Sequence, residues 1–402
     1  MHNTLVARTL LLHDRAVDFP VLDMDEEGRL TAIGTDPKAL AHESTVLGSG
    51  LFDVHMHGAT GIDVMTADDG QMRAMRRFLA RHGVAYFLPT TVTAPVDFTL
   101  QALERMARSI AEARDRDRPA GEAAPLGIHI EGPFLSHSKR GMHPSQDLQP
   151  PSLELFDRLQ AAAGGMIRMM TIAPEADAGP YAASEYERVS AVELIRHATA
   201  QGVACSVGHS NASSQETLTA IEAGAVSATH TFNAMRPLNH RDPGILGVVL
   251  DDDRLFADLI CDGVHVAAEA VRLWWKCKGP NRAILITDAL PGAGMGDGKF
   301  MVGDEWVTAD HGRALVTRDL EQGIETLAGS VLMLNQAVRK FMECTSACVE
   351  QGVRLASHNP AAMLRGNATH LAPGDFVNLT RWDQSGRLLA TYLRGREIPA
   401  AS

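Results

Sequence analysis

Several histidine and acidic side chains stand at the ends of short runs of branched apolar residues, where a strand would leave the core. His55 and His57 are two residues apart, so in an extended strand both imidazoles face the same side. Imidazole and carboxylate groups are ligands that Zn²⁺, Fe²⁺, Mn²⁺ and Co²⁺ accept, and Glu131 could bridge two ions. We therefore predict a divalent metal centre with one or two ions per subunit, zinc first among the candidates. The expected ligands are His55, His57, Glu131, His209, His230 and Asp288.

The chemistry expected of such a centre is hydrolysis. A bound divalent metal lowers the pKa of its water to about 7 and polarises a carbonyl, which the cleavage of an unreactive amide requires. Asp288 ends the last apolar run and is the best candidate for the general base, a role compatible with metal ligation. A single histidine at a strand end is more often structural, but the joint placement of these groups favours a metal. His129 either lies behind the ligands or only packs, and it is left out of the ligand set.

The elements that must position these groups alternate between short apolar runs and helix-like stretches. This alternation predicts an α/β fold, a TIM-like (β/α)8 barrel over residues 49–365, whose catalytic groups lie at the C-terminal strand ends. The expected strands are residues 51–57, 85–90, 126–131, 167–173, 203–208, 227–230, 256–262 and 283–287. The expected helices are residues 68–82, 96–115, 189–201, 213–223 and 267–278, with 330–350 closing the barrel.

Both ends of the chain have a different pattern. β-like runs broken by turn residues predict that residues 1–48 and 366–402 pair into one small β-sandwich domain beside the barrel. Between the eighth strand and the closing helix, residues 291–298 hold four glycines and are typical of a mobile active-site loop.

Composition limits the partners. The formal net charge of -12 argues against general attraction to nucleic acid or to an anionic membrane. No apolar run reaches the roughly 20 residues that span a bilayer, and His2 and Asn3 do not fit a signal peptide, so we expect a cytoplasmic protein. The five cysteines are an odd number without a C-x-x-C pair, which predicts reduced thiols rather than a disulfide framework.

The motifs around the candidate ligands resemble a known family. The chain is similar to the amidohydrolase superfamily and, within it, to the N-acetylglucosamine-6-phosphate deacetylases, over nearly its whole length. The segment after the third strand is the most specific, because other amidohydrolases usually carry a carboxylated lysine or a different acid there. The matching segments are residues 53–58, 129–134, 208–210, 230–235, 262–265, 287–289 and 327–330.

The resemblance implies roles that spacing alone does not assign. It implies that Glu131, His209 and His230 hold the main metal and that Asp288 activates the water, while His55 and His57 can hold a second ion in some members. His143 resembles the residue that helps to polarise the acetyl carbonyl. In the family, the arginine matching Arg241 comes from the neighbouring subunit, which implies a homodimer. The substrate-binding residues implied in this way are Met142, His143, Asn233, the backbone amide of Ala234, Arg241, His265, Leu327, Ala328 and Gly329.

A cationic patch supports a phosphorylated substrate independently. Basic residues of an otherwise acidic protein gather in the segments after the third, sixth and seventh strands, although scattered surface charge would give the same count. These residues are Lys139, Arg140, His143, Arg236, His240, Arg241 and His265.

The predicted reaction is hydrolysis of the acetamide of N-acetyl-D-glucosamine 6-phosphate to D-glucosamine 6-phosphate and acetate. The same chemistry on the galactosamine epimer stays open, since no residue discloses how one hydroxyl is read. A cyclic-amide or aminoacyl hydrolase of the superfamily would not need the cationic patch. A catalytically silent sugar-phosphate binding protein would not need Asp288 or the ligand set.

Overall fold

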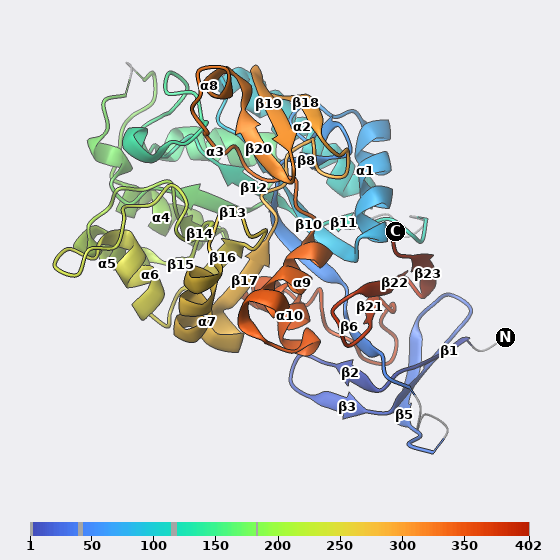
Figure 1. Cartoon of the computed structure of the whole chain (residues 1–402). Helices are drawn as coiled ribbons and strands as arrows, with labels where there is room; N and C mark the ends of the chain where they lie inside the picture. Colours follow the sequence, from blue (N-terminus) through green and yellow to red (C-terminus); the bar gives the residue numbers. More distant parts are fainter. Residues whose placement is uncertain (1–2, 39–42, 114–118, 182–183, 402) are drawn as a thin grey trace.

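The computed structural model describes residues 3–38, 43–113, 119–181 and 184–401, and it centres on a parallel barrel (Figure 1). Each strand of the barrel pairs in parallel with the strand that follows it around the barrel. The last and first strands close the barrel, because Met56 bridges Ala289 and the Asp288 amide donates to the His55 carbonyl at 2.9 Å. The predicted (β/α)8 barrel is therefore confirmed. Its strands are β7 (Leu51–Met56), β10 (Val84–Thr91), β12 (Ile128–Glu131), β13 (Ile167–Ile172), β14 (Ala204–Val207), β15 (Ala225–Ala228), β16 (Phe256–Ile260) and β17 (Ala283–Ile286).

Helices follow the strands and cover the outside of the barrel. Asp68, Ser190 and Ser213 form capping boxes that begin α1, α4 and α5, so their starts are encoded locally. The sequence prediction missed α3 and α6, and residues 114 and 115 of the second expected helix lie outside the described residues. Within the described chain, every helix is too short or too polar to cross a lipid bilayer. The bounds are α1 (Asp69–Arg81), α2 (Val96–Ala113), α3 (Leu153–Ala162), α4 (Ala191–Ala200), α5 (Ser214–Ala223), α6 (Gly244–Asp251) and α7 (Ala268–Arg282).

The expected closing helix over residues 330–350 is wrong in extent, because the structure divides this stretch. Helix α9 (Leu334–Thr345) ends at Ser346, whose φ of 60° is left-handed, and α10 (Val349–Leu355) and α11 (His358–Met363) follow. The Thr345 hydroxyl donates to the Phe341 carbonyl at 2.6 Å, and a polar side chain that bonds back to the backbone in this way favours a helix end.

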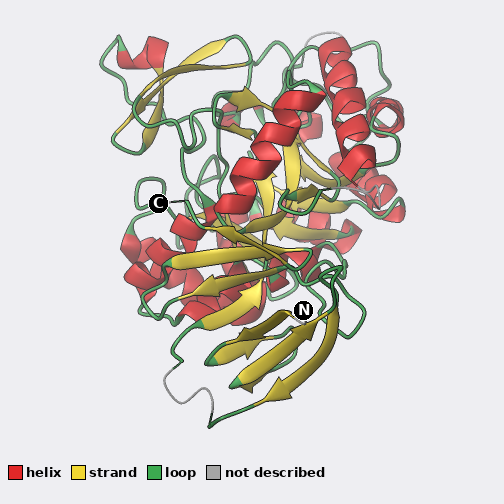
Figure 2. Cartoon of the chain, turned by 90° about the vertical axis from the view of Figure 1, so that its right-hand side faces the viewer, coloured by secondary structure: helices red, strands yellow, loops and turns green. Residues whose placement is uncertain are grey.

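An inserted sheet follows the eighth strand, and the sequence prediction did not include it. Residues 291–295 form turns that lead, through residues 296 and 297, into antiparallel strands β18 (Gly298–Val302), β19 (Glu305–Asp310) and β20 (Arg313–Val316), followed by α8 (Thr317–Leu320). The insert has its own apolar cluster, against which Met142 and Ala328 pack. Both views place it at the end of the molecule opposite the terminal β-domain (Figure 2).

The terminal β-domain joins both ends of the chain in two sheets that share one apolar core. The smaller sheet holds β1 (Asn3–Val6), β4 (Pro20–Met24) and β5 (Leu30–Thr35). The larger sheet runs in the order β23 (Arg396–Pro399), β22 (Leu388–Leu393), β21 (Leu379–Trp382), β6 (Val46–Ser49), β2 (Thr9–Leu11) and β3 (Ala16–Asp18). The small β module of both termini is thus present, while the exact domain limits at residues 48 and 365 stay a prediction.

Candidate metal centre and substrate pocket

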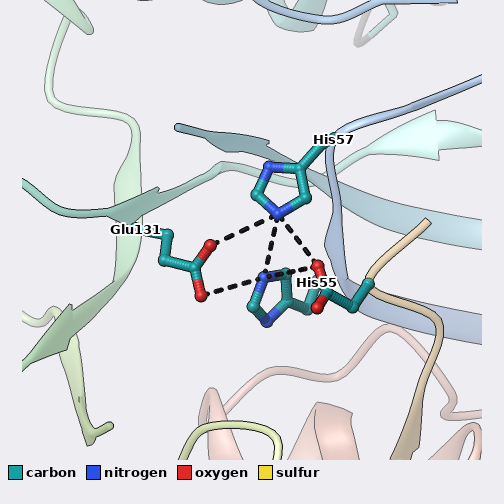
Figure 3. A group of neighbouring side chains, drawn as sticks. His55, His57 and Glu131 are labelled. Atoms are coloured by element: carbon teal, nitrogen blue, oxygen red, sulfur yellow. Dashed lines mark hydrogen bonds and ion pairs between the residues drawn. The ribbon is translucent and has the colours of Figure 1, made fainter. Parts of the chain in front are cut away.

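The candidate ligands meet at the C-terminal mouth of the barrel. Nε2 of His57 lies 3.3 Å from Glu131 and 3.0 Å from Asp288, and Nε2 of His55 lies 3.4 Å from each carboxylate. Figure 3 shows the rings of His55 and His57 aimed at Glu131. The Nε2 atoms of His209 and His230 approach the same carboxylate at 3.3 and 3.2 Å, both at Oε1, the oxygen that His55 also faces. The structure therefore brings together every ligand that the sequence predicts.

Backbone carbonyl groups fix the tautomers of three of these histidines. Nδ1 of His57 lies 3.1 Å from the Thr90 carbonyl, Nδ1 of His209 lies 2.8 Å from the Lys139 carbonyl, and Nδ1 of His230 lies 3.2 Å from the Asn233 carbonyl. Since a carbonyl only accepts, each Nδ1 must carry the proton. The lone pair of each neutral ring is then on Nε2, which points at Glu131, and this is the arrangement of metal-binding imidazoles.

The strand ends that carry the ligands are locally strained and held by buried acids. His209, His230 and Asp288 have φ values of 46°, 33° and 50°, in the sparsely populated left-handed region. Asp53 accepts from the Thr287 hydroxyl at 2.6 Å and from the Thr287 amide at 3.3 Å, next to Asp288. Asp258 accepts from the backbone amide of His230. Tertiary hydrogen bonds thus hold the ligands in conformations that isolated strands would not adopt.

The electrostatics favour a cation between the two acids. Burial would raise the pKa of Asp288, but His55 and His57 lower it to about 2. Burial is also the largest influence at Glu131, yet the charge of His55 and the hydrogen bonds from His143, His209 and His230 together hold its pKa well below the ordinary value. Burial opposes a charge on His57, yet hydrogen bonds to Asp288 and Glu131 raise its pKa to about 10. Two buried carboxylates therefore demand positive charge, which a protonated His57 supplies and which a divalent metal would supply in its place once Nε2 of His57 gives up its proton. The donor set fits such a metal.

His129 lies in the barrel interior beneath the ligands. Its Nε2 lies 2.8 Å from the Thr171 hydroxyl, which continues to the Thr229 hydroxyl at 2.9 Å. Its ring meets the ring of His55 edge-on, with 4.7 Å between centroids. His129 therefore packs against a candidate ligand within a buried hydroxyl network, and it stands apart from the Nε2 cluster.

A cavity of about 350 Å³ opens above the centre. It is lined by His57, Glu131, His209, His230 and Asp288 from the candidate centre. The loops supply most of the sequence-predicted substrate residues, namely Met142, His143, Asn233, Ala234, His265, Leu327, Ala328 and Gly329. Arg241 is not among the lining residues; it is exposed on the loop before α6. Lys139 also lines the cavity. In the sequence it belongs only to the cationic patch, because no motif includes it.

His143 is set up as a hydrogen-bond donor in this cavity. Its Nδ1 accepts from the Thr93 backbone amide at 3.2 Å, so in the neutral ring the proton sits on Nε2, 3.4 Å from Glu131. Burial lowers the pKa of His143 to about 4, against the opposing pull of Glu131. The ring is thus neutral at pH 7, and its Nε2–H can donate to a carbonyl oxygen. His143 also belongs, with Glu131 and His209, to a group of side chains that could hold a metal.

His265 is held from below by Asp262. One carboxylate oxygen of Asp262 lies 2.7 Å from Nδ1 of His265, and the other accepts from the backbone amides of Val264 and His265 at 2.8 and 2.9 Å. Residues 262–265 therefore form one hydrogen-bonded turn. This turn holds the imidazole of His265 at the cavity wall.

The parallel barrel and this His–carboxylate centre at its mouth define the class of the chain, a hydrolase of the amidohydrolase superfamily. No family model matches the chain. The N-acetylglucosamine-6-phosphate deacetylase of Bacillus subtilis (strain 168) is 35% identical over 345 residues, which are 84% of this chain and 82% of that protein. The chain belongs to the family of N-acetylglucosamine-6-phosphate deacetylases.

Two further likenesses bear on the substrate. The N-acetylgalactosamine-6-phosphate deacetylase of Escherichia coli O157:H7 is 33% identical over 399 residues, 98% of this chain and 99% of that protein. A solved structure of N-acetyl-D-glucosamine-6-phosphate deacetylase from Mycobacterium smegmatis, in complex with N-acetyl-D-glucosamine-6-phosphate, has a TM-score of 0.86 at 30% identity and covers 98% of this chain and 99% of that chain. The likeness extends over the barrel and the terminal β-domain alike.

Proposed function

We propose that the chain hydrolyses the acetamide of N-acetyl-D-glucosamine 6-phosphate, giving D-glucosamine 6-phosphate and acetate. The main support is that one cavity is lined by the metal-type donors, the buried carboxylate of Asp288 and the Nε2–H of His143. An amide needs an activated water, a polarised carbonyl and a proton for its leaving amine. These residues can supply all three.

The metal would be held by Glu131, His209 and His230, with His55, His57 and Asp288 available for a second ion. Zinc is the first candidate, and iron, manganese or cobalt would suit the same donors. A divalent ion bound there would lower the pKa of a water and polarise the acetyl carbonyl. Two overlapping donor groups support one or two ions, because Glu131 belongs both to the group of His55, His57 and Asp288 and to a group with His143 and His209, beside which His230 lies 3.2 Å from the same carboxylate.

The residues of the chain would move protons around that centre. Asp288, ionised at neutral pH, would take the proton of the attacking water and pass it to the nitrogen of the leaving amine. His143 would donate its Nε2–H to the carbonyl oxygen as negative charge develops there. Thr93 would keep His143 in the donating tautomer throughout, since its backbone amide cannot change roles.

Loop residues at the mouth of the barrel would bind the sugar phosphate. Asn233, the Ala234 amide and His265 would bind the phosphorylated end together with Arg241, while Met142 and residues 327–329 would line the sugar. Because Arg241 is exposed and absent from the cavity wall, we propose that it serves the site of a partner subunit in a homodimer. A cytoplasmic location fits a substrate that is phosphorylated inside cells.

The galactosamine epimer is the second candidate, favoured by the match over 98% of the chain to the Escherichia coli O157:H7 protein. A catalytically silent binder is disfavoured, because it would not need Asp288 in the cavity. Acetate release from the phosphorylated glucosamine and galactosamine substrates, and from their unphosphorylated forms, tests the proposal, with elemental analysis on the same sample. Activity independent of the phosphate would contradict it.

A further inference from the structure

Two cysteines meet beside the substrate pocket. Cys261 follows β16 and is fully buried in the barrel core, and Cys344 lies half-buried on α9, packed against that core. Their thiols lie close enough for each to shift the pKa of the other. An independent contact shows the same closeness: a Cβ on Gly263 would lie 3.6 Å from Cδ and Cε of Lys340. The last turns of α9 thus lie directly on the segment that leads to His265.

The two thiols differ in reactivity. The hydrogen bond with Cys261 lowers the pKa of Cys344 to about 7, with burial opposing and the Lys340 ammonium assisting. The same hydrogen bond and burial raise the pKa of Cys261 well above its ordinary value. The thiolate is the nucleophile in disulfide exchange, so Cys344, which solvent reaches, is the attacking group and Cys261 the resolving one.

We propose that Cys261 and Cys344 form a reversible disulfide that weakens substrate binding. The oxidant is a low-molecular-weight disulfide. The Cys344 thiolate attacks one of its sulfurs, its S–S bond breaks, and one thiolate leaves. The Cys261 sulfur then loses its proton and attacks Cys344 in the mixed disulfide, which forms the Cys261–Cys344 bond and releases the second thiol. Two protein thiols are oxidised while one small disulfide is reduced to two thiols.

Formation of this disulfide should change the shape of the substrate pocket. A disulfide brings its sulfurs to about 2.0 Å, closer than hydrogen-bonded thiols, so one of the two segments must shift. Cys261 stands between Ile260, which lines the cavity, and the 262–265 turn, which Asp262 holds together. A displacement of Cys261 is therefore transmitted to His265. The candidate metal ligands lie on other strands, and β16 reaches one of them through Asp258, which accepts from the His230 amide, so metal content is measured beside KM.

The experiment uses the full chain, reduced, loaded with zinc, and equilibrated with mixtures of oxidised and reduced glutathione. Peptide mapping detects the disulfide, and rates of acetate release give KM for N-acetyl-D-glucosamine 6-phosphate. Only the KM measurement rests on the proposed function. We expect a Cys261–Cys344 link and a rise in KM of roughly 10-fold to 100-fold, as for one lost charge-assisted hydrogen bond. Dithiothreitol should reverse both.

Cys344→Ser should keep its KM under the same oxidation, whereas Cys348→Ser, which removes the most exposed thiol, should respond like the wild type. Absence of the link at the most oxidising ratio would overturn the proposal. So would a link without a change in KM, or equal inhibition of Cys344→Ser. An inactive reduced protein would instead reject the proposed function, and the peptide map would still decide whether the disulfide forms.

Discussion

The metal-type donors and Arg241, the proposed phosphate anchor, are held in opposite ways. His57, His209 and His230 are buried at strand ends, and backbone carbonyls set the proton on each ring. Arg241 is exposed on a loop, and among the described residues the hydrogen-bond partner seen for it is the Asn239 side chain, which accepts from its backbone amide at 2.9 Å. The comparison teaches that rigid strand ends suit groups that must act on the reacting bond, whereas an exposed loop arginine suits a contact to the substrate. Changes at the strand ends should therefore lower kcat, and a change at Arg241 should raise KM.

Asp288→Asn should have the largest effect. The amide keeps the size of the side chain but cannot take a proton, so kcat should fall about 10²-fold to 10⁴-fold while KM changes little. Steady-state kinetics, with metal content and circular dichroism on the same sample, check this. Asp304→Asn, on an exposed turn of the insert, is the matched control and should keep its activity. A near-normal kcat for Asp288→Asn would remove it from the role of base.

Arg241→Ala should have the next largest effect, and on the other side of the comparison. Loss of a charged contact to the phosphate should cost about 2 to 5 kcal/mol, seen mainly in KM. Initial rates over a wide range of substrate concentration measure it. Arg254→Ala removes an exposed arginine that pairs with Asp252 and should leave KM unchanged. If the loss of activity appeared in kcat with KM unchanged, Arg241 would take part in the chemical step, and the contrast between the strand ends and this loop would be wrong.

Mixed dimers test whether Arg241 acts across subunits. Subunits with Arg241→Ala and subunits with Asp288→Asn are each nearly inactive alone. If Arg241 serves the partner, one site of each mixed dimer is whole, and random exchange should restore roughly a quarter of wild-type activity. Mixing that restores nothing, although exchange is shown by a mass tag, would assign Arg241 to its own chain.

The paired change His55→Gln with His57→Gln sharpens the donor side of the comparison. If this pair holds a second ion, metal content should fall by one equivalent while the site of Glu131, His209 and His230 stays loaded. Elemental analysis after dialysis gives the stoichiometry, and His370→Gln, exposed on the terminal β-domain side, is the control. An unchanged stoichiometry would mean that the pair only supports the other ligands.

The smallest effect is expected away from both regions. Asp68 caps α1 by accepting from the Gln71 amide at 2.8 Å, so Asp68→Ala should lower the free energy of unfolding by about 1 kcal/mol and leave kinetics unchanged. Urea unfolding followed by circular dichroism measures it. Asp69→Ala, one residue on and without this bond, should cost less. A kinetic change in Asp68→Ala would show that the scaffold and the site are coupled.

Local patterns were sufficient to predict the barrel and the meeting of the candidate ligands at its mouth. Short apolar runs buried on both faces mark parallel strands, and a polar residue after each run must lie at the mouth. The inserted sheet escaped prediction because its strands β18 to β20 are short and partly exposed and cover only a small apolar cluster. The break at Ser346 escaped because a left-handed serine has no distinctive sequence signal.

The finer features of the site could not be predicted for a different reason. The groups that set the histidine tautomers are backbone carbonyls of Thr90, Lys139 and Asn233, and every residue has a carbonyl. The tautomer of His143 is set by the backbone amide of Thr93, and almost every residue has such an amide, so the sequence gives no sign of it. The pairing of Cys261 with Cys344 depends on how α9 packs, which spacing along the chain does not disclose.

Metal removal tests the central claim most directly. The protein is stripped with a chelator, its metal content is measured, and zinc is added back stepwise while acetate release from N-acetyl-D-glucosamine 6-phosphate is followed. The account predicts no turnover in the stripped protein and activity that rises in proportion to bound zinc until the Glu131, His209 and His230 site is filled. Full activity in a sample shown to be free of metal would contradict it.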